Sequence, residues 1–517
     1  MRRIFSLLLT GLLLPAGPLR AADPPPPLFA DDWESLRRAP VPAWFEDAKF
    51  GIFIHWGAYS VAGYHAQGKG YAEHFPKFLY ASPGEYYPFL REHFGGVPPA
   101  FGYQDLIPLF RAEKWRPEEW ADLFRRAGAR YVVLTAEHHD GFALWDSELT
   151  PWCATKMGPH RDLVGDLARA VRARGLKFAP SYHRERHPGF FARELYAPVS
   201  TPRPDVAAEI AQRPAAAGLY GPFAYTDEFI ADYVARWQEL DRKFRPDFLW
   251  LDDIPLFYKA PNAPETQKFR NACRRMIAEY LNAAAARGQA VYLNNKGPNG
   301  NWPAGVGCRE KDNLRLPVSG PKWQNPATLG TSYGYLAVEE EQDRYKSPAE
   351  LIRLLCDVVS KNGNLLLNIG PRADGTIPEG MTRRLLAIGG WLDVNGEAIY
   401  GTRPWRVPAE TPPKPGERTD VSHPPPPTQD WRFTLGGSDR KTLYAILLGP
   451  APAGVEVTIA SLSPAGAGAD WPVTRVDVLG SEERVVWQRT PAGLVLALPR
   501  QLPARADLGI VVRLGGK

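Results

Sequence analysis

The chain has 517 residues, which is more than one domain usually needs and fits a barrel of ordinary size followed by a smaller unit. Its 62 Lys and Arg nearly balance its 57 Asp and Glu, so its charge indicates neither a nucleic-acid partner nor an acidic one. The 16 Trp, 21 Tyr and 23 Phe include candidates for packing against sugar rings, although aromatic side chains also fill cores.

Residues 1–22 have the pattern of a secretory signal: Arg2 and Arg3 are followed by an apolar stretch and by small residues ending at Ala22. The apolar stretch is too short to span a membrane. We therefore expect an exported protein, periplasmic or secreted, with no membrane contact after signal cleavage. The 4 cysteines have no metal-ligand spacing, and their disulfide pairing stays open.

Apolar runs alternate with amphipathic helical segments over most of the chain. The expected buried strands are Phe50–Ile54, Tyr131–Thr135, Leu176–Tyr182, Phe248–Leu251, Ala290–Asn295 and Asn364–Ile369. The expected helices are Pro117–Ala127, Asp162–Arg174, Glu228–Phe244, Thr266–Arg287, Pro348–Ser360 and Arg383–Val394. This alternation predicts an α/β protein of the (β/α)8 or TIM type. No Gly-rich phosphate loop follows a strand, which argues against nucleotide chemistry.

Near Trp405 the pattern changes to short alternating segments separated by Gly and Pro, which is typical of an antiparallel β-sandwich. We therefore divide the chain into a signal peptide (1–22), a catalytic (β/α) barrel (23–404) and a C-terminal β-sandwich (405–517).

The ends of the predicted barrel strands carry histidines and carboxylates. These residues are His55, His138, His139, Asp140, His183, Asp252 and Asp253. A zinc site could use such a set, but adjacent His138 and His139 on an extended segment should point to opposite sides, and no His-Glu-x-x-His motif occurs. We expect no metal and no cofactor. Glycoside cleavage is the other candidate chemistry, and it needs one ionised and one protonated carboxyl group.

Five segments resemble the α-L-fucosidases of glycoside hydrolase family 29. They are Trp44–Gly57, Ala127–Phe142, Asp247–Asp252, Asp357–Pro371 and Asn395–Thr402. The resemblance runs from about Trp44 to the C-terminus. It implies a retaining exo-hydrolase that releases terminal α-L-fucose from fucosylated oligosaccharides or glycoconjugates through a covalent glycosyl-enzyme.

The resemblance also implies roles for individual residues. Asp252 matches the nucleophile, and Asp253 takes a supporting or turn role. Glu310 is the candidate acid/base, with Asp312 as its rival in the same segment. The residues implied to hold the sugar are His55, Glu73, His138, His139, Tyr182, Trp250 and Tyr333.

The chemistry requires different protonation states for the two carboxyl groups. Asp252 must be ionised, so it needs hydrogen bonds or a nearby cation, which a protonated histidine could supply. Glu310 must hold a proton, so we expect burial or the charge of Asp252 to raise its pKa. Retention predicts the two carboxyl groups about 5–5.5 Å apart.

Two other functions stay open at this point. One is a related hydrolase acting on α-L-galactosides, which the polarity beside Tyr333 would distinguish. The other is a non-catalytic fucose-binding protein on the same scaffold. The sequence also leaves open a homo-oligomer, the natural aglycone and the fucose linkage.

Overall fold

The computed structural model describes residues 28–68, 70–297, 300–310, 320–410, 430–436 and 440–516. The predicted signal peptide and Asp312 lie outside these residues.

Strands β1 to β8 form a closed parallel barrel, in chain order. Closure is visible in the register, because Phe53 of β1 pairs with Val133 of β2 on one side and with Asn368 of β8 on the other. The strands are β1 (Phe50–Ile54), β2 (Tyr131–Glu137), β3 (Lys177–Tyr182), β4 (Phe248–Leu251), β5 (Tyr292–Lys296), β6 (Val306–Cys308), β7 (Trp323–Thr328) and β8 (Gly363–Ile369). The predicted barrel is confirmed.

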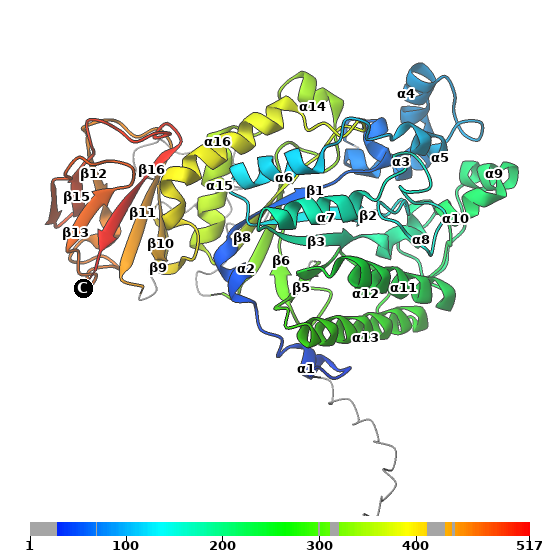
Figure 1. Ribbon diagram of the computed structural model, residues 1–517, viewed down its shortest axis with the longest axis horizontal. Helices are drawn as coiled ribbons and strands as arrows, with labels where there is room; N and C mark the ends of the chain where they lie inside the picture. Colours follow the sequence, from blue (N-terminus) through cyan, green and yellow to red (C-terminus); the bar gives the residue numbers. More distant parts are fainter. Residues whose placement is uncertain are drawn as a thin grey trace, which may run out of the picture.

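The longer helices surround the barrel or extend from it (Figure 1). They are α4 (Pro83–Phe94), α6 (Pro117–Arg126), α7 (Leu163–Ala173), α9 (Pro204–Gln212), α11 (Asp227–Phe244), α13 (Pro264–Ala286), α15 (Pro348–Ser360) and α16 (Glu379–Asn395). Several begin at side-chain caps: Asp162 accepts from Gly165 N, and Ser347 forms a capping box with Glu350. These caps explain why the predicted helix starts lie close to the observed ones.

Shorter helices occupy the connections. They are α1 (Trp33–Leu36), α2 (Ala43–Ala48), α3 (Phe75–Ala81), α5 (Tyr103–Leu106), α8 (His187–Phe190), α10 (Ala217–Tyr220), α12 (Leu256–Lys259) and α14 (Ala337–Glu341). The 3-10 segments are η1 (Ala58–Val61), η2 (Ala72–His74), η3 (Ile107–Leu109), η4 (Arg184–Arg186), η5 (Pro214–Ala216), η6 (Gly396–Ala398) and η7 (Ala460–Leu462). None of the described helices is long and apolar enough to cross a membrane.

The barrel interior is aromatic towards the amino ends of its strands. Phe248 and Tyr292 stack there with ring centroids 4.7 Å apart, and Phe45 lies 4.1 Å from Tyr292. Trp250 belongs to the same buried cluster. This packed base leaves only the carboxyl ends of the strands open for a polar site, as in other barrels of this type.

Two antiparallel sheets follow the barrel. The larger has the order β13-β16-β11-β10-β9 and the smaller β12-β15-β14. Their strands are β9 (Arg403–Glu410), β10 (Trp431–Gly436), β11 (Thr442–Leu448), β12 (Glu456–Ile459), β13 (Arg475–Val478), β14 (Trp487–Thr490), β15 (Gly493–Ala497) and β16 (Gly509–Gly515). The predicted C-terminal antiparallel architecture is confirmed, and β9 is a strand that the sequence pattern did not predict.

The larger sheet packs against α15 and α16 (Figure 1). Arg432 of β10 donates to Asp357 of α15 at 2.8 Å, and both side chains are buried. Trp391 Nε1 of α16 donates to Gly509 O at 2.9 Å. These contacts join the sheets firmly to the barrel.

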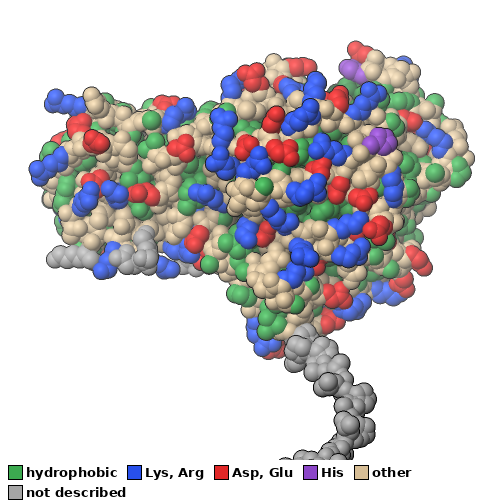
Figure 2. Space-filling model, viewed as in Figure 1, with side chains coloured by type: hydrophobic (Ala, Val, Ile, Leu, Met, Phe, Trp, Pro, Cys, Tyr) green, Lys and Arg blue, Asp and Glu red, His purple; other side chains and the backbone are tan. Residues whose placement is uncertain are grey.

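The four cysteines, Cys153, Cys273, Cys308 and Cys356, are buried and unpaired. Figure 2 shows basic and acidic side chains interspersed over the viewed face. This distribution agrees with the nearly balanced composition.

Candidate active site

Two carboxyl groups meet at the carboxyl ends of β4 to β6. Asp252 directly follows β4 and Glu310 lies just beyond β6. Lys296, the last residue of β5, contacts Asp252 Oδ1, and its Nζ lies 2.9 Å from Glu310 Oε1. The side chain of Asp252 is 5% exposed and that of Glu310 is 33% exposed. One ammonium group therefore links a buried carboxylate to a partly exposed one.

Asp252 is held in its ionised form by neighbouring cations. Burial by itself would raise the pKa of Asp252, but the charge of Lys296, the neighbouring His183 imidazole and the charge of Arg186 outweigh it and hold this pKa well below its usual range. Arg186 Nε lies 3.7 Å from Asp252 Oδ2. The expected ionised aspartate is present.

The prediction that a protonated histidine could supply the positive charge beside Asp252 was wrong. His139 Nε2 and His183 Nδ1 lie 3.4 and 3.8 Å from Asp252 Oδ2. Burial, however, holds the pKa of both imidazoles well below the usual value, so they are neutral. The cations beside Asp252 are Lys296 and Arg186.

Glu310 also departs from expectation. Burial is the largest single influence and tends to raise the pKa of Glu310, but the charge of Lys296 and the hydrogen bonds from Lys296 and Tyr333 together outweigh it and lower the pKa. Tyr333 OH donates to Glu310 Oε1 at 3.0 Å and further favours the ionised form. The predicted upward shift is therefore wrong for the free protein, because Lys296, which the strand pattern did not include, lies between the two acids.

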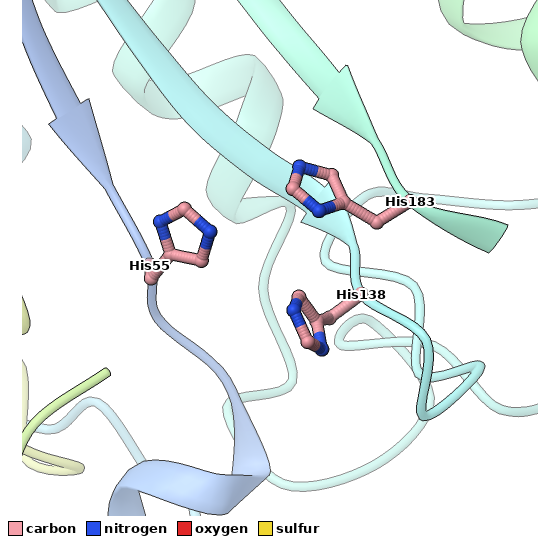
Figure 3. Close-up of side chains that lie close together, drawn as sticks. All are labelled: His55, His138 and His183. Carbon is pink, nitrogen blue, oxygen red and sulfur yellow. The ribbon is translucent and has the colours of Figure 1, made fainter. Parts of the chain in front are cut away.

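Three histidines lie around a common space at the ends of β1, β2 and β3 (Figure 3). His55 Nδ1 is 2.7 Å from Asn368 Oδ1, and His183 Nε2 is 2.9 Å from Ser181 Oγ. Each of these rings is held through one nitrogen, and the other nitrogen of His183 faces Asp252. His138 Nδ1 is buried without a hydrogen-bond partner. Such orphaned nitrogens are suited to sugar hydroxyls.

His138 and His139 do not point to opposite sides, contrary to the prediction. Their ring centroids are only 4.2 Å apart. Strand β2 ends at Glu137 and the chain then turns, with Gly141 at φ 82°, so the alternation of an extended chain stops before these residues.

This proximity creates donor sets that could hold a metal ion. His55, His138 and His183 form one set, and His139, His183 and Asp252 form another, each with ligand atoms within 4.8 Å of one another. Neutral imidazoles suit a borderline divalent cation such as zinc. Lys296 and Arg186 oppose a further cation beside Asp252. The same nitrogens can bind hydroxyl groups without a metal.

Glu73 lies at the edge of the same site, on η2. It accepts hydrogen bonds from Gly334 N at 2.7 Å and from Ser332 Oγ at 3.2 Å. Burial raises the pKa of Glu73 to about 7, so it can accept or donate a hydrogen bond near neutral pH. Asp140 is not part of this cluster, because its carboxyl group bonds to Tyr103 OH.

Tyr333 and Trp250 adjoin the site in different ways. The ring of Tyr333 lies 4.8 Å from that of His55. Trp250 is fully buried beneath the site, where it stacks on His183 with centroids 5.2 Å apart and lies 5.3 Å from Lys296 Nζ. Trp250 thus supports the histidine and lysine that face the opening.

Tyr182 is not brought to the site, contrary to expectation. Its hydroxyl donates to the carbonyl of Tyr233 in α11 at 3.1 Å, and its ring packs on that same residue. Its neighbours Ser181 and His183 face the barrel interior instead, as the alternation of β3 requires. Of the two residues, His183 lies near Asp252, with its Nδ1 3.8 Å from Asp252 Oδ2.

Asp253 supports the site through Arg186. Arg186 Nη2 lies 3.0 Å from Asp253 Oδ2, and Tyr258 OH donates to the same oxygen at 2.8 Å. This contact orients the guanidinium whose Nε faces Asp252. The supporting role expected for Asp253 agrees with this geometry.

Sequence reasoning missed Lys296 and Arg186 as site residues. The predicted strand ended at Asn295, and β5 continues for one more residue to Lys296. A strand predicted one residue longer would have placed Lys296 at the site. Arg186 lies in η4, beyond the end of β3, and nothing in its local pattern indicates that it reaches Asp252. A cleft of about 650 Å³ opens beside these cations and Glu310.

A TIM-type barrel that holds two carboxyl groups and several imidazoles at its strand ends has the arrangement of a glycoside hydrolase. The family model for alpha-L-fucosidase matches residues 21–397, and the chain belongs to that family. Rat tissue alpha-L-fucosidase is 32% identical over 95% of this chain and 93% of its own length. The human tissue enzyme is 32% identical over 97% and 94%.

Solved structures show the same similarity. The Thermotoga maritima alpha-fucosidase in complex with fucose has a TM-score of 0.71 and 32% identity, covering 94% of this chain and 100% of its own. The same enzyme in complex with a mechanism-based inhibitor has a TM-score of 0.72 with the same coverage.

Proposed function

We propose that this protein is a retaining α-L-fucosidase that removes terminal fucose from fucosylated oligosaccharides or glycoconjugates. The observation that carries the proposal is the ionised Asp252, buried beneath neutral histidines and joined through Lys296 to Glu310. The fucose and mechanism-based inhibitor complexes of related enzymes support this assignment. The proposal includes no cofactor.

The first step breaks the glycosidic bond. An oxygen of Asp252 attacks the anomeric carbon while Glu310 gives its proton to the leaving oxygen, and a glycosyl ester with Asp252 results. Lys296 lowers the pKa of Glu310, so the protonated form of Glu310 that this step needs becomes abundant only at lower pH.

The second step hydrolyses the ester. Asp252 has lost its charge, and Lys296 is left facing an ionised Glu310. Glu310 then removes a proton from water as the water attacks the anomeric carbon, and Asp252 leaves as a carboxylate. The lysine that disfavours the acid form of Glu310 in the first step favours its basic form in the second.

Binding of the sugar falls to the neutral histidines and Glu73. A neutral imidazole can both donate and accept a hydrogen bond, and these rings already have one nitrogen fixed by the protein. Fixed partners keep the free nitrogens oriented before the sugar arrives, which lowers the entropic cost of binding.

An aryl α-L-fucoside assay on the wild type, Asp252→Ala and Glu310→Ala tests the proposal. Asp252→Ala should be inactive, and azide should restore turnover with β-fucosyl azide as product. Glu310→Ala should keep hydrolysis only of substrates with good leaving groups, and azide should then give the α-azide. Full activity of Asp252→Ala would contradict the assignment, and faster cleavage of an α-L-galactoside would favour the related hydrolase.

We also propose that the protein is exported to the periplasm or the medium. The charged, apolar and small-residue pattern of residues 1–22 supports this location. Cell fractionation and N-terminal sequencing of the mature protein test it, with a start near residue 23 expected. An uncleaved chain in the cytoplasm would contradict it.

A further inference from the structure

The cleft beside the carboxyl pair has the position of a leaving-group site. Its lining includes Arg186, Asp253, Asn295, Lys296, Arg309 and Glu310. Glu310 is the more exposed of the two acids and lies at this cleft, whereas Asp252 lies deeper. Under the proposed function, the group that receives the proton of Glu310 must therefore occupy this cleft.

Five charged groups at the cleft form an alternating chain. Asp253 faces Arg186 at 3.0 Å, Arg186 faces Asp252 at 3.7 Å, and Lys296 joins Asp252 to Glu310. Each of the two cations thus lies between two carboxylates. These groups satisfy one another and need no charge from a ligand while the site is empty.

Arg309 lines the same cleft but stands outside that chain of charges. Its backbone is fixed by β7: Arg309 N donates to Gln324 O at 2.9 Å, and Asn325 Nδ2 donates to Arg309 O at 2.6 Å. Its side chain is exposed and makes no ion pair with any residue in the described part of the chain. Within the described residues, the guanidinium next to the candidate acid therefore has no carboxylate partner.

Catalysis increases the positive charge of this cleft. In the reactive complex Glu310 is protonated, and once it has given up that proton Asp252 is the uncharged, esterified group, so one negative charge is missing at each stage relative to two ionised acids. Lys296 and Arg186 then have one acid fewer to face, and Arg309 has no acid partner among the described residues. A negative charge supplied by the leaving group would compensate this excess.

We propose that the leaving-group side of the site selects an acidic aglycone, whose carboxylate or sulfate binds Arg309. This inference rests on the proposed fucosidase activity and deepens it by naming the class of substrate. A carboxylate is planar and a sulfate is tetrahedral, but each presents two oxygens that a guanidinium can bind through paired N–H donors.

Matched aryl α-L-fucosides test the inference. The 3-carboxyphenyl fucoside is compared with the 3-carbamoylphenyl fucoside, and the 3-sulfophenyl with the 3-sulfamoylphenyl, because the members of each pair have similar size and differ in charge. The wild type should give a charged-to-neutral ratio of kcat/KM of about two to five, the effect expected of one partly exposed ion pair. This ratio should fall as salt is added. The two pairs show whether the selected anion is a carboxylate or a sulfate-like group.

Arg309→Gln should bring the ratio close to one, and Arg309→Glu should bring it below one. Arg275→Gln is the matched control, because Arg275 is exposed on α13 and outside this cleft. A wild-type ratio near one, or an equal loss of the ratio in Arg275→Gln, would overturn the inference. Hydrolysis of the neutral fucosides reports the proposed function separately, since its complete absence would contradict the fucosidase itself.

Discussion

Lys296 Nζ lies 2.9 Å from Glu310 Oε1 while the same amine contacts Asp252. The two acids raise the pKa of Lys296 above its usual value in spite of its burial, so it is a cation throughout the working pH range. This contact makes the ionisation of the two carboxyl groups interdependent.

Replacement of this lysine should move the pH profile of kcat/KM. In Lys296→Met, the pKa values of Asp252 and Glu310 should both rise, by about one to three units for the loss of a neighbouring opposite charge. Activity needs Asp252 ionised and Glu310 protonated, so both the acidic and the alkaline limb should move to higher pH. Lys296→Arg, which keeps the charge, is the control. Identical limbs in wild type and Lys296→Met would contradict the electrostatic role.

The neighbours Tyr182 and His183 should separate stability from activity. His183→Ala should lower kcat/KM about ten- to a hundredfold, as expected when a buried site loses a strong hydrogen bond. Tyr182→Phe removes only the bond to the carbonyl of Tyr233, so it should cost about 0.5–1.5 kcal/mol of unfolding free energy with little change in kcat/KM. Steady-state kinetics and chemical denaturation give the two readouts. A large loss of activity in Tyr182→Phe at unchanged stability would contradict this account and show that Tyr182 acts in the site.

These two residues also show where the sequence stops being informative. The apolar runs that end in Asp252 and His55 were sufficient to predict buried strands and a polar rim. A one-residue difference along β3 decides whether Tyr182 or His183 faces the interior, and the family resemblance alone could not settle it. The turn after β2 likewise brings His138 and His139 together.

Short or polar strands were also hard to predict. Strand β6 covers only Val306–Cys308, and β7 contains Gln324, Asn325 and Pro326, so neither shows a continuous apolar run. Because Glu310 follows β6, its position could be assigned only from the order of motifs. Its contact with Lys296 follows from the pairing of β5 with β6, which the sequence pattern did not predict.

A pair of buried lysines outside the site predicts an effect on stability. Lys49 and Lys322 are buried next to the amino ends of β1 and β7, and neither Nζ has a hydrogen-bond acceptor among the described residues. Burial lowers the pKa of both amines; the charge of Arg403 lowers that of Lys49 further, and the charge of Lys49 lowers that of Lys322 further. Lys322→Met should therefore increase the unfolding free energy by about 1–3 kcal/mol, measured by denaturant titration at neutral pH. The exposed Lys259→Met should leave it unchanged. Destabilisation by Lys322→Met would show that this amine has a stabilising partner.

The same lysines should make stability depend on alkaline pH. The pKa of Lys49 falls from 10.5 to about 8 on folding, so between these values the unfolded chain binds more protons than the native one. The unfolding free energy should therefore rise with pH across that interval. The difference between wild type and a Lys49→Met/Lys322→Met variant isolates this contribution from tyrosine ionisation. A difference independent of pH from 8 to 10 would contradict the assigned shift.

Trapping of the covalent intermediate tests the central claim most directly. Wild-type protein is inactivated with a 2-deoxy-2-fluoro-α-L-fucosyl donor, digested and analysed by mass spectrometry. The fluorofucosyl label should reside on Asp252, in the peptide that continues from β4, and Asp252→Ala should remain unlabelled. A label on Asp253, Glu310 or any other residue would contradict the proposed nucleophile.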